Sequence, residues 1–137
     1  MTIEERVIDA AHRVRALCAG EPTIEKLVKL LEDPENKWRP SVIVYSDEGI
    51  QDGELARAVP NQPLGGKSFT ILVRPVLRNS MDLLPILAHE MCHVILGHWI
   101  IGFPGGLEEA CHRFAVELLQ MPRAEYDQVR QRYRGVY

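Results

Sequence analysis

The sequence feature that most constrains the fold is an apolar stretch over residues 83–96 with polar side chains near its centre. Its length predicts a buried helix, and Asp82 just before it is a residue type that favours the helix N-cap. His89, Glu90 and His93 interrupt the apolar residues. Because burying polar groups without partners costs free energy, the pattern indicates that these three side chains have binding partners.

Two of the polar residues are spaced so that they can bind one metal ion. His89 and His93 are four positions apart and therefore project from the same face of a helix. Neutral imidazole favours zinc over magnesium or calcium. Glu90 follows the first histidine, where its carboxylate can take a proton from a water molecule on the open side of the ion. The run His89-Glu90-Met91-Cys92-His93 predicts the zinc-binding and catalytic core of a metallopeptidase.

Such a site needs a third protein ligand, and the residues with suitable atoms are His98, Glu108, Glu109 and His112. His98 would lie close to the opposite side of a continued helix. In the following helix, Glu108 shares a stripe with small and apolar residues, whereas the stripe of Glu109 is mostly polar. The stripe favours Glu108 as the ligand. A carboxylate that only stabilises the helix N-terminus is the simpler alternative.

Other side chains near the motif have open roles. His112 lies one turn after Glu108 and can hydrogen-bond a ligand, or it can be a partly exposed helical histidine. We expect Cys92 and Cys111 to be small packing residues between the two helices. Hydrolysis also needs a donor for the carbonyl oxygen of the substrate. The sequence does not choose among His98, His112, Tyr45 and the C-terminal tyrosines and arginines.

Composition limits the functional classes. The chain has 137 residues, so we expect residues 1–137 to form a single domain. Its formal net charge of −3 provides no basic field that would attract nucleic acid. Three cysteines without a CxxC pair suit a reducing compartment. Without a signal peptide pattern or a stretch long enough to cross a bilayer, a cytoplasmic protein that binds neither membrane nor nucleic acid is expected.

Hydrophobic periodicity and turn residues predict the secondary structure. Helices are expected over residues 3–18, 24–33, 83–97, 107–121 and 123–134, and strands over 41–46, 55–59 (weak) and 68–74. Residues 47–67 are rich in turn formers and can border a substrate cleft. The expected class is α+β, with a small mixed or antiparallel sheet packed on the motif helix and on the helix with Glu108.

Two blocks of this sequence resemble a known family. Residues 87–98 resemble the active-site helix of the ImmA/IrrE metallopeptidases, and residues 107–122 resemble that family's second signature. Aligning Phe114 and Ala115 with the Phe-Ala of that signature places the family's ligand glutamate on Glu108. The family often has Gly and Asn where this chain has Cys92 and His112.

The resemblance implies a zincin-like minimal metallopeptidase domain with Zn²⁺ held by His89, His93 and Glu108, and with Glu90 as the catalytic base. It further implies site-specific cleavage of a helix-turn-helix transcriptional repressor, in a bacterium, phage or mobile element. The chain lacks the helix-turn-helix and sensor modules of some members, so we expect it to be the minimal catalytic unit.

Two alternatives remain open from the sequence. A SprT-like protease acting on DNA-bound proteins would also have His-Glu-Met-x-His, but its third ligand is normally a histidine further along the chain. A zinc-stabilised module that binds a partner without cutting it is the non-catalytic alternative. Glu90 speaks against that module, because a purely structural metal site has no use for a base beside an open coordination position.

Overall fold

A computed structural model describes residues 1–35, 38, 41–61, 68–97 and 100–137 of the chain. In this part of the chain it contains, in order, α1 (Ile3–Leu17), α2 (Ile24–Glu32), β1 (Ser41–Tyr45), β2 (Ala56–Pro60), β3 (Phe69–Val73), the short 3-10 helix η1 (Pro75–Leu77), α3 (Leu83–Ile95), α4 (Leu107–Leu119) and α5 (Arg123–Gln131). The predicted α+β class is confirmed, and each predicted helix and strand is present with bounds that differ by a few residues.

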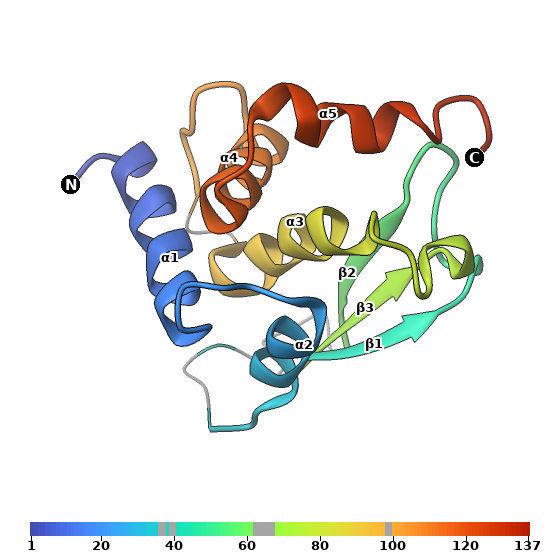
Figure 1. Cartoon of the computed structure of the whole chain (residues 1–137), viewed down its shortest axis with the longest axis horizontal. Helices are drawn as coiled ribbons and strands as arrows, with labels where there is room; N and C mark the ends of the chain where they lie inside the picture. Colours follow the sequence, from blue (N-terminus) through green and yellow to red (C-terminus); the bar gives the residue numbers. More distant parts are fainter. Residues whose placement is uncertain (36–37, 39–40, 62–67, 98–99) are drawn as a thin grey trace.

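The three strands form one mixed sheet. β3 is central, pairing in parallel with β1 and antiparallel with β2, so the strand order is β1-β3-β2. Figure 1 shows α3 between this sheet and the helices α4 and α5. α3 contacts β2 and α2, while α4 packs against both α1 and α3. The motif helix therefore lies at the centre of the molecule, with β2 as the strand against it.

α3 is buried on nearly all sides. Ten of its thirteen residues are buried, including His89 and Glu90. A helix that is apolar around its whole circumference is stable only when other elements cover it, and the sheet, α2 and α4 provide that cover. This explains why its sequence lacks the clear polar face of α2 or α5.

Asp82 is the N-cap residue of α3, as predicted, but its side chain makes no capping hydrogen bond. Its carboxylate instead accepts hydrogen bonds from Arg132 and from the Tyr133 hydroxyl, the latter at 2.7 Å. These bonds fix the region after α5 to the start of α3. Thr23, by contrast, caps α2 with its side chain, which accepts a hydrogen bond from the Lys26 backbone N–H.

Glycine and left-handed backbone positions set the ends of the site helices. Gly106, the N-cap of α4, has φ +92° and ψ −176°, a backbone conformation that residues with a Cβ rarely adopt. α4 starts directly after it, so Glu108 lies in the first turn. α4 ends at Leu119 rather than the predicted residue 121, because Gln120 adopts a left-handed conformation with φ 53°.

The Leu87 side chain tests how strongly the fold depends on α3. It is fully buried, whereas Leu17 at the end of α1 is 59% exposed. Leu87→Ala should lower the free energy of unfolding by about 2–5 kcal/mol, because it removes buried apolar surface and leaves a cavity. The matched Leu17→Ala should cost less than about 1 kcal/mol. Urea denaturation measures the free energy of unfolding of both variants. Equal decreases in the two would contradict the central position of α3 in the fold.

Candidate metal centre

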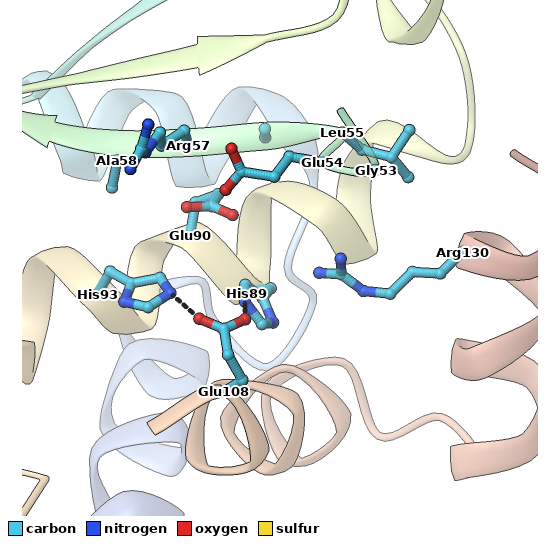
Figure 2. Close-up of a pocket in the computed structure, with 11 residues that line it drawn as sticks. Gly53, Glu54, Leu55, Arg57, Ala58, His89, Glu90, His93, Glu108 and Arg130 are labelled. Carbon is cyan, nitrogen blue, oxygen red and sulfur yellow. Dashed lines mark hydrogen bonds and ion pairs between the residues drawn. The ribbon is translucent and has the colours of Figure 1, made fainter. Parts of the chain in front are cut away.

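His89 and His93 of α3 face the same carboxylate, Glu108 of α4. The Nε2 atom of His89 lies 3.0 Å from one Glu108 oxygen, and the Nε2 atom of His93 lies 3.2 Å from the other. Figure 2 shows the carboxylate between the two imidazoles. The i, i+4 spacing on α3 and the tight turn before α4 thus bring together the three side chains that the sequence singled out as ligands.

The environment gives the three groups different protonation preferences. Burial lowers the pKa of His89 to about 4, so this imidazole is neutral at neutral pH. Burial also acts to lower the pKa of His93, but hydrogen bonds with Cys111 and Glu108 outweigh it and raise that pKa. Hydrogen bonds from both histidines hold the pKa of Glu108 well below its usual range. The cluster therefore pairs an anionic carboxylate with one neutral and one protonated imidazole.

The donor set fits a divalent metal ion. Zinc bonds of about 2.0–2.1 Å in tetrahedral geometry place neighbouring ligand atoms about 3.3 Å apart. The two nitrogen–oxygen distances of 3.0 and 3.2 Å are close to that spacing. Two groups of described residues have possible ligand atoms that all lie within 4.8 Å of one another, His89–His93–Cys111 and His89–Glu108–His112, and the predicted set is divided between them. The described residues can therefore hold a metal ion between α3 and α4.

The second ring nitrogen of His89 is held by α4 and α5. Its Nδ1 lies 3.2 Å from the Tyr126 hydroxyl and 3.2 Å from His112 Nδ1, and these last two atoms are 2.8 Å apart. Burial lowers the pKa of His112, which favours a neutral ring whose Nδ1 can donate to the tyrosine hydroxyl or accept its proton, depending on the tautomer. A ligand histidine whose free nitrogen is hydrogen-bonded has a fixed orientation. His112 thus takes the supporting position that the sequence left open, and Tyr126 was not foreseen.

Glu90 lies on the side of α3 that faces β2. It is only 5% exposed, and burial raises its pKa to about 7 although the Ala58 backbone N–H hydrogen-bonds its carboxylate. A carboxylate with a pKa near neutrality can both accept and return a proton. Figure 2 shows it beside the histidines and below β2.

A pocket of about 360 Å³ opens onto these side chains. Its walls come from β2 and the turn before it, from α3 and α4, and from α5, and its lining residues are Gly53–Ala58, His89, Glu90, His93, Glu108 and Arg130. The expectation that the segment after β1 borders a cleft holds for residues 53–58; residues 62–67 lie outside the described residues.

The other ligand candidates from the sequence lie elsewhere. Both oxygens of Glu109 accept hydrogen bonds from Arg123, at 2.6 and 3.0 Å, so this carboxylate belongs to a surface ion pair with α5. His98 lies outside the described residues. Cys92 and Cys111 are both fully buried between α3 and α4, as expected of packing residues. Cys111 also hydrogen-bonds His93, a contact that the sequence did not indicate.

Comparisons with known proteins give no independent identification. No protein-family model matches the chain, and neither a curated protein nor a solved structure matches it. No helix in the described ranges is long and apolar enough to span a membrane.

The adjacent carboxylates Glu108 and Glu109 provide a matched test of the metal centre. Glu108→Ala should weaken zinc binding more than about 100-fold, because even hydrogen-bond partners of metal ligands contribute 10–100-fold. Glu109→Ala removes only the exposed pair with Arg123 and should leave zinc affinity unchanged. Competition titration with a chromophoric chelator measures both. Equal losses of zinc affinity in the two variants would contradict the assignment of Glu108, rather than Glu109, as the metal ligand.

The Tyr126 hydroxyl provides a second test. Tyr126→Phe removes the group that fixes His89 and His112, so zinc affinity should fall about 10–100-fold while the ring still packs. Tyr133→Phe is the control, since its hydroxyl bonds Asp82 away from the metal centre. The same titration applies, and unchanged zinc affinity in Tyr126→Phe would show that the hydroxyl does not support the ligand.

Proposed function

We propose that the protein is a zinc-dependent endopeptidase of the ImmA/IrrE type that cleaves a helix-turn-helix transcriptional repressor at a specific site. The observation that carries the catalytic part is the position of Glu90, a buried carboxylate in the same pocket as His89, His93 and Glu108. A metal site that only stabilises the fold has four protein ligands and no open pocket beside it.

The chain's own residues have distinct roles in this proposal. His89, His93 and Glu108 would hold the ion, which when bound lowers the pKa of a water molecule and polarises the substrate carbonyl. Glu90 takes a proton from the attacking water and returns it to the leaving amine. Tyr126 and His112 keep the His89 ring in one orientation.

The edge of the sheet supports a peptide as the substrate. Within the described strands, β2 pairs with β3 alone; its Ala58 N–H bonds Glu90, and β2 residues 56–58 line the pocket. A strand with an unpaired edge can hydrogen-bond an extended peptide backbone. Such a peptide would pass over Glu90 and the two histidines. The repressor as the source of the peptide rests on the family resemblance of residues 87–98 and 107–122.

Glu90→Gln tests the catalytic role. The amide keeps the size of the side chain but cannot accept the proton, so cleavage should fall at least about 100-fold while zinc content and thermal stability are retained. The assay incubates the zinc-loaded protein with the helix-turn-helix repressor encoded nearest to its gene and identifies fragments by mass spectrometry.

Chelation with EDTA should stop cleavage and added zinc should restore it. Substantial cleavage by Glu90→Gln would exclude this residue as the base. Zinc binding without cleavage by the wild type would instead support the non-catalytic partner-binding module.

A further inference from the structure

Arg130 of α5 extends into the pocket that contains the metal-ligand candidates, as Figure 2 shows. Two of its guanidinium nitrogens, Nε and Nη2, are buried and have no hydrogen-bond partner among the described residues. A buried charged donor without an acceptor is costly. An acceptor that arrives with a bound molecule would remove that cost.

The two unpartnered nitrogens lie on one edge of the guanidinium group. The N–H bonds of Nε and Nη2 are parallel and form the fork that binds two oxygens on one atom. The Tyr126 ring lies 6.0 Å from the guanidinium carbon, and the guanidinium also interacts with the Tyr126 hydroxyl. The side chain is therefore supported by the residue that orients His89, while its fork remains available.

The other oxygen-binding candidates from the sequence are engaged or placed elsewhere. The Tyr126 hydroxyl bonds His89 and His112, and the Tyr133 hydroxyl donates to Asp82. Tyr45 belongs to β1, on the opposite edge of the sheet from β2. Arg130 is the one of these described candidates that lines the pocket with the metal ligands.

Hydrolysis changes the number of oxygens on the reacting carbon. When water adds, its oxygen forms a bond to the carbonyl carbon, the carbonyl π electrons move to the carbonyl oxygen, and Glu90 takes the water's proton. The C–N bond then breaks as Glu90 returns this proton to the nitrogen, and the second water proton, still on the adduct's hydroxyl, also passes to the amine, so that an ammonium group leaves and a carboxylate remains. A peptide carbonyl presents one oxygen, but the adduct and the product carboxylate present two.

We propose that Arg130 is a catalytic residue whose Nε and Nη2 donate hydrogen bonds to the two oxygens that the scissile carbon carries once water has added. This rests on the proposed peptidase function. Because the fork is fully used only after addition, Arg130 stabilises the transition state more than the bound peptide. Arg130→Gln should lower kcat about 100-fold with little change in KM.

A product-like carboxylate gives a readout independent of cleavage. We would titrate N-acetylglycine into the zinc-loaded protein and follow it by NMR. Arg130→Gln should weaken this binding about tenfold or more. The affinity of Arg130→Lys for N-acetylglycine should lie between those of the wild type and Arg130→Gln, since lysine keeps the charge but loses the fork. Zinc content and melting temperature of each variant are measured first; if Arg130→Gln is unstable, Arg130→Lys decides.

Arg134 provides a matched control. It lines the neighbouring pocket. Arg134→Gln should bind N-acetylglycine as the wild type does. Equal weakening by Arg134→Gln would mean that any nearby cation suffices and would overturn the proposal.

Three further outcomes are decisive. Unchanged N-acetylglycine binding in Arg130→Gln would overturn the proposal. A higher KM with unchanged kcat in this variant would also overturn it, because that result would indicate recognition of a substrate carboxylate instead. If the wild type cleaves no repressor, the proposed function fails, but the N-acetylglycine titration still decides whether Arg130 binds a carboxylate beside the metal centre.

Discussion

The structure depends on the cost of burying polar groups within α3. His89 and Glu90 lie inside a helix that is covered on nearly all sides, and each needs a partner there. Glu108 on α4, Tyr126 on α5 and the Ala58 N–H on β2 supply those partners. Three elements distant in sequence are thus held against α3 by polar contacts as well as by apolar packing. The same contacts surround the pocket.

Much of the architecture was predictable because it depends on local patterns. Helical periodicity, the β-branched runs of β1 and β3 and the Thr23 cap each depend on neighbouring residues. The preference for Glu108 over Glu109 came from which helix stripe is apolar. The structure separates these neighbours accordingly: Glu108 faces the histidines and Glu109 pairs with Arg123. Consecutive helix positions differ by about 100°, which is enough to divide them between pocket and surface.

The α5 contribution could not be predicted from sequence. Its composition is that of a polar, solvated helix, and nothing in residues 123–131 marks Tyr126 or Arg130 as different from their neighbours. Their contacts lie across the fold, and Tyr126 is 37 positions after His89. The contacts of the Asp82 carboxylate could not be predicted for the same reason, because two residues beyond α5 engage it. Long-range pairing decides these details, and single-sequence patterns do not encode it.

A hydroxyl group can reverse its direction of donation, and at Tyr126 this has a consequence for how the neighbouring histidine ring is held. With Glu108 accepting a proton from His89 Nε2, the tyrosine can donate to His89 Nδ1 and accept from His112. If the His89 proton is on Nδ1 instead, as it would be with Nε2 bonded to a metal, the same three atoms bond in the opposite sense. In either arrangement His89 Nδ1 and the Tyr126 hydroxyl both have a hydrogen-bond partner. The His89 ring can therefore keep one orientation whichever of its nitrogens carries the proton, so α3 and α5 stay linked through Tyr126 in both tautomers.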